Sequence, residues 1–78
     1  MAKRPTRRNT YTFQLIVWSN IRRYQYIQKM TDEQLCESLG VSNRTLYVYD
    51  KDPSNLTLEK VDNFMERTGI GIEALIIS

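Results

Sequence analysis

Apolar residues between positions 13 and 28 recur at intervals of three and four, which is the spacing of one face of an α-helix. They are Phe13, Ile16, Val17, Ile21 and Tyr24, followed by Ile27 or Gln28. The spacing predicts one amphipathic helix that ends near residue 28. Trp18 lies off this stripe, so we expect it to be partly exposed.

The stretch 31–50, TDEQLCESLGVSNRTLYVYD, contains two short helical runs separated by a glycine. Thr31 and Gln34 fit a capping box, in which each side chain bonds to the backbone N–H of the other residue. Gly40 suits the left-handed conformation that ends a helix, and Ser42 can cap the next helix immediately. The pattern therefore predicts two helices that cross at a tight turn.

The two predicted helices each have an apolar side. In the first, the buried positions are Leu35, Cys36 and Leu39, and in the second they are Leu46 and Tyr49. The second helix then leaves one side facing outward, with Thr45 at its edge. The residues expected on that outward side are Asn43, Arg44, Tyr47 and Val48.

The remainder of the chain predicts two more helices and no strand. Residues 52–55, DPSN, have the composition of a loop. Thr57 can cap a helix that ends near Thr68 and whose core face is Leu58, Val61, Phe64 and Met65. Residues 72–77 then form a last short apolar helix. We therefore expect an all-α fold of five helices.

Composition and charge narrow the class of protein. Seventy-eight residues make one domain, and one cysteine with no histidine leaves no disulfide framework and no usual zinc site. No apolar run approaches the roughly 20 residues of a membrane span. We therefore expect a cytoplasmic protein without metal or cofactor. It is not expected to be an enzyme, because Asp50 and Asp52 are more typical of capping or solvated carboxylates than of a catalytic pair.

The basic residues are unevenly distributed. Residues 1–10, MAKRPTRRNT, contain four cations and no acid, whereas the other 68 residues contain 7 basic (11 − 4) and 9 acidic side chains. The four cations are Lys3, Arg4, Arg7 and Arg8. We divide the chain into a flexible basic arm, residues 1–10, and a helical domain, residues 11–78.

From about Asn20 to Leu75 the chain resembles the lambda-repressor-like helix-turn-helix family, which comprises Cro- and CI-like (XRE-type) regulators of phages and their bacterial relatives. Residues 31–50 follow the family pattern T-Q-E-x-L-A-x-x-L-G-V-S-x-x-T-I-x-x-[WIY]-E without an inserted residue. The matching flanking positions are Ile21, Arg22, Tyr24, Leu58, Glu59, Val61 and residues 69–75. The resemblance implies a compact five-helix domain with a central helix-turn-helix.

The resemblance also implies a function: sequence-specific DNA binding by a transcriptional regulator of phage or mobile-element type. The helix that begins at Asn43 would lie in the major groove of double-stranded DNA. The positions that match base-reading residues are Asn43, Arg44, Tyr47 and Val48, and the expected backbone contacts are Ser42, Thr45, Lys51 and the arm residues Lys3, Arg4, Arg7 and Arg8. Arginine can bind guanine through two hydrogen bonds, asparagine can bind adenine in the same way, and valine suits the thymine methyl group.

Two positions depart from the family pattern. Lys29 replaces a glycine, and Asp32 replaces a glutamine that faces the phosphate backbone, where a carboxylate would be repelled. Asp32 favours a second hypothesis, a protein-binding modulator of another repressor with weak or no DNA binding. Three narrower hypotheses stand beside it: Arg44 is only a solvated charge, the arm is a solubilising tail, and Tyr26 and Tyr47 stack on single strands.

The C-terminal residues predict an association surface. Ile72, Leu75, Ile76 and Ile77 are more apolar side chains than a short helix can bury, and exposed apolar clusters often mark interfaces. We expect them to form a homodimer interface or a contact with another regulator protein. A dimer would place two reading helices about 34 Å apart on a two-fold symmetric DNA site.

Overall fold

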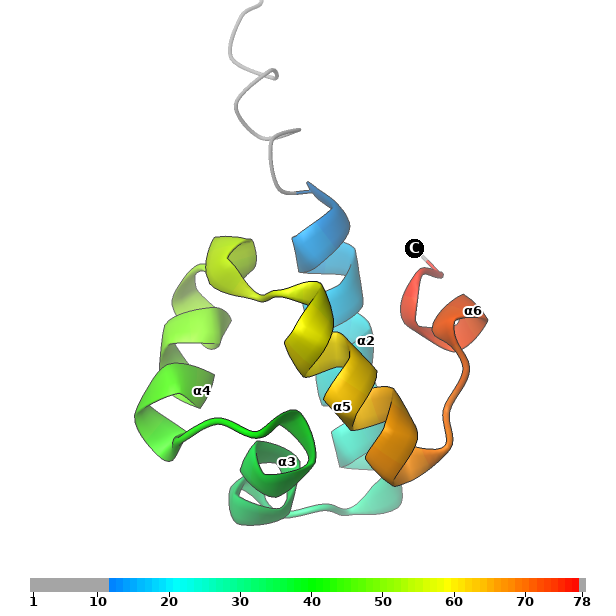
Figure 1. The fold of residues 1–78 in the computed structure, drawn as a ribbon, viewed down its shortest axis with the longest axis horizontal. Helices are drawn as coiled ribbons and strands as arrows, with labels where there is room; N and C mark the ends of the chain where they lie inside the picture. The colour runs from blue at the N-terminus through cyan, green and yellow to red at the C-terminus, as the bar shows by residue number, and fades with distance from the viewer. Residues whose placement is uncertain (1–11, 78) are drawn as a thin grey trace, which may run out of the picture.

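The computed structural model describes residues 12–77, which form five α-helices and one short 3-10 helix (Figure 1). In chain order these are α2 (Thr12–Gln28), α3 (Asp32–Leu39), α4 (Asn43–Lys51), η1 (Pro53–Asn55), α5 (Leu58–Thr68) and α6 (Ile72–Leu75). Residues 12–77 contain no strand, so the prediction of a small all-α fold is confirmed. No helix in this range combines the length and apolar character needed to cross a membrane.

The core lies where the five α-helices meet. α5 packs on α3, α6 packs on α2, and η1 contacts both α2 and α4 (Figure 1). Each α-helix contributes at least one fully buried side chain. The largest of these are Phe64, Ile21, Leu35, Leu39, Leu46, Leu75 and Val17. Burial of such side chains is the main driving force for folding in a domain of this size.

The turn between α3 and α4 has the predicted local structure. Thr31 and Gln34 form both hydrogen bonds of the capping box, and the Ser42 side chain accepts a hydrogen bond from the backbone N–H of Thr45. Gly40 ends α3 in the left-handed conformation, with a φ of 78°. The backbone N–H groups of Gly40 and Val41 both donate to the Cys36 carbonyl, at 2.8 and 3.0 Å. The corner is therefore specified by local hydrogen bonds.

The expectation that Trp18 is partly exposed was wrong. Its side chain is buried, its ring meets the ring of Tyr49 edge-on at 5.2 Å, and its Nε1–H donates to Asp50. The reason is that α2 is covered on two sides. On one side α6 packs on α2, and Phe64 of α5 meets Tyr24 edge-on. On the other side Tyr49 and Asp50, at the end of α4, contact Trp18.

Phe13 and Leu58 were predicted to face the core, and both are exposed in the structure, Leu58 by 75%. Each lies in the first turn of its helix, where the other elements of residues 12–77 leave it exposed. Together with Val17, Leu56 and Val61 they line an open groove of about 360 Å³ between α2, η1 and α5. The helical period places these two residues on the correct stripe, but the stripe extends beyond the packed region.

Candidate nucleic-acid interface

The outer face of α4 carries the side chains that were predicted to face outward. Asn43, Arg44, Tyr47 and Val48 are exposed, whereas Leu46 and Tyr49 on the opposite face are buried in the core. This separation follows from helical geometry, because positions three and four apart share a face. Ser42 stands at the exposed start of the helix, and Thr45 is half-buried beside it.

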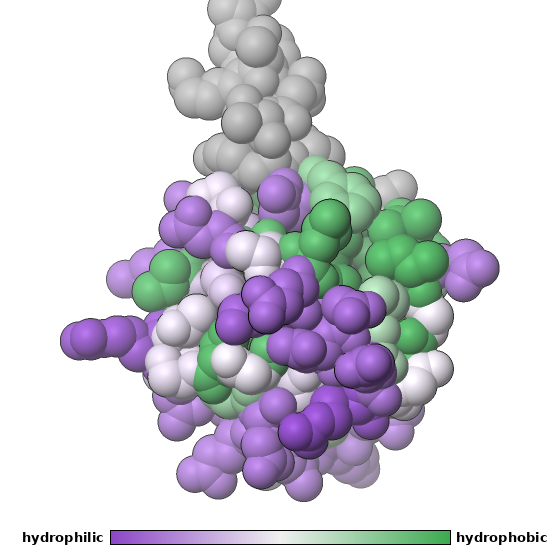
Figure 2. Space-filling model, viewed as in Figure 1, coloured by the Kyte–Doolittle hydropathy of each residue, from purple (hydrophilic) through white to green (hydrophobic). Residues whose placement is uncertain are grey.

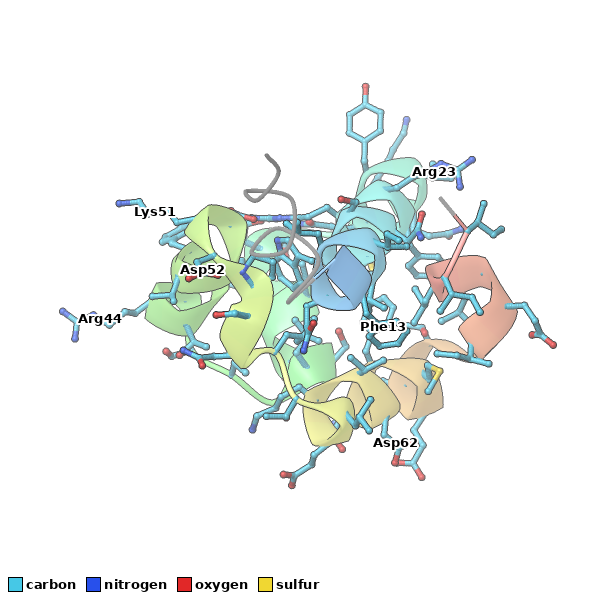
Figure 3. All side chains as sticks on the ribbon, turned by 90° about the horizontal axis from the view of Figure 1, so that it is seen from above. Phe13, Arg23, Arg44, Lys51, Asp52 and Asp62 are labelled. Atoms are coloured by element: carbon cyan, nitrogen blue, oxygen red, sulfur yellow. The ribbon has the colours of Figure 1, made fainter. Side chains whose placement is uncertain are left out.

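The outer face of α4 carries two cationic side chains. Arg44 and Lys51 extend away from the body of the domain on the same side (Figure 3). With Tyr47 and Val48 they line a shallow depression of about 450 Å³, to which no acidic side chain contributes. A guanidinium, an ammonium, a phenol and a small apolar side chain are groups suited to phosphates and base edges.

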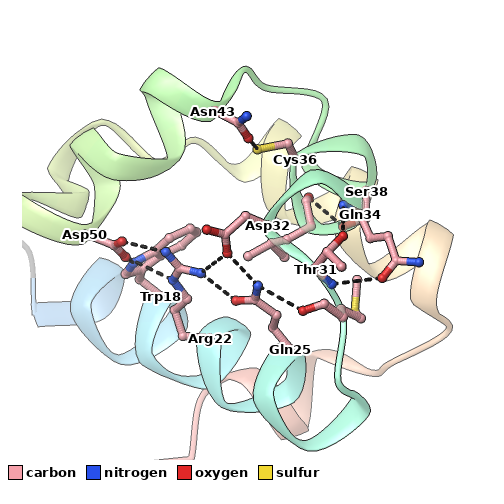
Figure 4. Close-up of polar contacts among 12 residues, drawn as sticks. Trp18, Arg22, Gln25, Thr31, Asp32, Gln34, Cys36, Ser38, Asn43 and Asp50 are labelled. Carbon is pink, nitrogen blue, oxygen red and sulfur yellow. Dashed lines mark hydrogen bonds and ion pairs between the residues drawn. The ribbon is translucent and has the colours of Figure 1, made fainter.

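The C-terminal end of α4 is fixed to α2 through Asp50. Arg22 of α2 donates hydrogen bonds from Nε and Nη2 to the two carboxylate oxygens of Asp50, and the Trp18 Nε1–H donates to Oδ1 at 2.9 Å (Figure 4). The guanidinium also lies over the Trp18 ring, 5.6 Å from its centroid. The hydrogen bonds from Arg22 lower the pKa of Asp50, and the hydrogen bond from Trp18 lowers it by a smaller amount. A two-point ion pair of this kind sets the orientation of α4 as well as its distance from α2.

Asp32, the residue expected to repel phosphate, turns toward the same arginine. Its Oδ1 accepts hydrogen bonds from Gln25 at 2.8 Å and from Arg22 at 3.0 Å (Figure 4). These hydrogen bonds lower the pKa of the Asp32 carboxyl, and the bond from Gln25 has the largest effect. Asp32 is half-buried and ion-paired, so its charge is partly neutralised within the domain. Arg22 thus forms ion pairs with two carboxylates, one at the start of α3 and one near the end of α4.

A contact across the turn joins Cys36 of α3 to Asn43 of α4. The Cys36 Sγ–H donates to the Asn43 Oδ1 at 3.0 Å. The Cys36 side chain is buried, and burial raises the pKa of its thiol. The sequence indicated packing for Cys36 and base contact for Asn43, but nothing in it indicated that the two side chains meet.

The apolar surface exposed near the C-terminus is smaller than predicted. Leu75 was expected to belong to it, but this side chain is completely buried in the domain's own core, so that assignment was wrong. α6 ends at Leu75, and the Asn20 Nδ2 binds the carbonyls of Leu75 and Ile77, which hold the segment against α2. Ile72, Ile76 and Ile77 are exposed, and Figure 2 shows apolar surface where α6 lies.

The remaining predicted residues have other positions. Lys3, Arg4, Arg7 and Arg8 lie outside the described residues, as does the rest of the arm. Asp52 caps η1, since its side chain accepts a hydrogen bond from the backbone N–H of Ser54. Within residues 12–77 no group of three or more His, Cys, Asp or Glu side chains is placed to hold a metal ion.

The sequence did not predict that Arg22 and Trp18 contact Asp50 and so fix the end of α4. The sequence shows only that a cation and an indole lie one helical turn apart on the predicted first helix. No protein-family model, no curated protein and no solved structure matches the chain. The functional inference therefore depends on the geometry of α4 and on the residues that hold it.

Proposed function

We propose that this protein is a sequence-specific regulator that binds double-stranded DNA by inserting α4 into the major groove. The observation that carries the proposal is the outer face of α4, where Arg44, Tyr47, Val48 and Lys51 are exposed together with no acid among them. The resemblance to lambda-repressor-like regulators supports the same assignment of α3 and α4 as a helix-turn-helix.

The size of α4 suits this role. An α-helix with its side chains is about 10–12 Å across, so the major groove of B-DNA, about 12 Å wide, admits it. The nine residues of α4 span roughly 13.5 Å along the helix axis at 1.5 Å per residue. The ion pair with Asp50 holds the end of the helix, so its outer face is presented in one orientation. A rigid reading helix loses little entropy on binding, which favours discrimination between sequences.

The charges near α4 are compatible with a polyanionic partner. Asp32 at the start of α3 and Asp50 near the end of α4 are both paired with Arg22. Lys51 ends α4, and the four arm cations add positive charge that would release counterions from DNA. Binding should therefore weaken steeply as salt is raised.

Selection from a library of random duplexes tests the proposal, followed by fluorescence anisotropy with the selected duplex. Arg44→Ala should reduce discrimination at one base position by roughly 5- to 100-fold, the factor expected for one good arginine–guanine pair. Arg23→Ala is the matched control, because Arg23 is an exposed arginine of α2 that points to a different side of the domain (Figure 3). It should leave base preference unchanged.

The outcomes separate clearly. No enriched duplex, or equal affinity for selected and scrambled duplexes, would refute sequence-specific binding. Equal effects of Arg44→Ala and Arg23→Ala on duplex binding would show that binding depends only on overall charge. In that case α4 would not be the reading element.

A second candidate function is binding to another copy or another regulator through the C-terminal isoleucines. The observation that favours it is the exposure of Ile72, Ile76 and Ile77 on a segment tied to α2. Sedimentation velocity should show a concentration-dependent dimer that Ile76→Asp weakens. Ile27→Asp, at an exposed isoleucine of α2, is the control and should leave the dimer intact. A monomer at high micromolar concentration would exclude self-association, and capture of a repressor without DNA binding would favour the modulator.

A further inference from the structure

Asn43, the first residue of α4, has a side chain that is already hydrogen-bonded within the domain. Its Oδ1 accepts from the Cys36 Sγ–H at 3.0 Å, so the carbonyl end of the amide faces α3. The Nδ2 lies on the other side of the amide, away from Cys36 (Figure 4). The side chain is exposed, so this nitrogen, with its two N–H donors, is the group available to a partner.

We infer that Cys36 orients Asn43 so that Asn43 selects bases with a carbonyl group in the major groove. Guanine O6 and thymine O4 are carbonyl acceptors and fit an outward N–H donor, whereas cytosine N4 is a donor and does not. Adenine offers only its N7 acceptor, beside an N6 donor that the carbonyl of Asn43, already bonded to Cys36, cannot accept. An unconstrained asparagine prefers adenine instead, because it uses its carbonyl and its N–H together. The inference deepens the proposed function and rests on it.

The chemistry of Cys36 supports this role. Only the protonated thiol can donate to a carbonyl oxygen, and burial keeps the thiol protonated near neutral pH by raising its pKa. The Cys36 side chain is buried, with 6% of the residue exposed, so water competes little for the bond. Cys36 is a positioning residue here, because it acts on DNA only through Asn43.

Three variants test the orientation before any DNA is added. Cys36→Ala removes the donor, Cys36→Ser keeps an O–H donor on the same carbon, and Ser38→Ala truncates another small buried side chain of α3. Ser38 is the matched control because its hydroxyl bonds within α3, to the Leu35 carbonyl. Three-bond NMR couplings report the Asn43 χ1 angle, and residual dipolar couplings of the Nδ2–H bonds report the orientation of its amide about χ2. Together they should indicate one orientation in the wild type, Cys36→Ser and Ser38→Ala. They should indicate averaging in Cys36→Ala, and unchanged couplings there would overturn the orienting role.

Selection from random duplexes then tests the base preference. The wild type should enrich guanine or thymine at the position read by Asn43, identified as the one position where Asn43→Ala loses its preference. Cys36→Ala should shift that position toward adenine by roughly 5- to 100-fold relative to the wild type. Cys36→Ser and Ser38→Ala should keep the wild-type base.

The two proposals fail in different ways. If the wild type enriches no duplex, sequence-specific binding fails and the base preference fails with it, while the couplings still decide whether Cys36 orients Asn43. If a duplex is enriched but Cys36→Ala selects the same base as the wild type, only the inference about Cys36 is overturned. Wild-type enrichment of adenine at the Asn43 position would overturn it equally.

Discussion

Asp50→Asn removes the charge from the carboxylate that fixes α4 to α2 and nearly preserves the shape of the side chain. In the wild type, Arg22 binds both carboxylate oxygens, and the Trp18 indole donates to one of them. The asparagine keeps a carbonyl oxygen that can still accept from Trp18. The substitution therefore tests the two-point ion pair more than the packing around it.

The expected loss of stability follows from the exposure of the pair. Hydrogen bonds to charged groups contribute about 1.5–3 kcal/mol. The side chains of Arg22 and Asp50 are 27% and 38% exposed, and solvent screening at this exposure lowers the value to about 1–2 kcal/mol. In a domain of this size, that corresponds to a fall of about 5–15 °C in Tm. The assay is thermal and urea unfolding, followed by helical circular dichroism and by Trp18 fluorescence.

The pH dependence provides the sharper test. Arg22 lowers the pKa of Asp50 in the folded state, so its stabilising effect is present above the unfolded pKa, about 3.9. That effect is lost as the pH falls through the folded value. The deficit of Asp50→Asn should therefore be full at pH 7 and should shrink progressively as the pH falls below about 3.9. Asp62→Asn, at an exposed aspartate of α5, should lose almost no stability at pH 7. A deficit of Asp50→Asn that stays constant between pH 7 and pH 2 would refute the ion-pair account.

Three further predictions concern the backbone and the core, and urea unfolding measures each of them. Lys29 has a φ of 57°, so Lys29→Gly should raise the free energy of unfolding by up to about 1 kcal/mol, and a decrease would show that this turn is not strained. Gly40→Ala and Gly69→Ala should each lower the free energy of unfolding by about 1–2 kcal/mol, because alanine is strained at a left-handed φ. The larger decrease is expected at Gly40, where the new methyl group meets a side chain at 3.3 Å. Leu58→Ala should change stability by less than about 0.5 kcal/mol, whereas Leu46→Ala should cost about 2–5 kcal/mol, and similar losses would contradict the observed burial.

The features that the sequence predicted well are those decided within a few residues. The capping box of Thr31, the left-handed Gly40 and the cap at Ser42 each satisfy backbone groups one turn away or less. The inward positions of Leu46 and Tyr49 follow from the helical period alone. Local hydrogen bonding and periodicity therefore sufficed to identify the outward face of α4.

The features that the sequence did not predict depend on which elements lie next to one another. Trp18 is buried because the end of α4 packs beside it. Leu58 is exposed because it lines an open groove that the other described elements do not fill. Leu75 is buried in the core, whereas Ile76 and Ile77, which follow the end of α6, are exposed. The hydrogen bond between Cys36 and Asn43 likewise depends on how α3 and α4 cross. The spacing of residues predicts that the two helices cross, but it does not predict their relative orientation.

The most direct test of the central claim is a map of the surface that meets DNA. Amide resonances of the labelled protein would be followed by NMR while a mixed-sequence duplex is added at low salt, where non-specific binding already engages the charged face. The account predicts that the largest shifts fall in residues 42–51 and fade as salt is raised. Shifts gathered on α5 and α6, or no shifts at all, would contradict it.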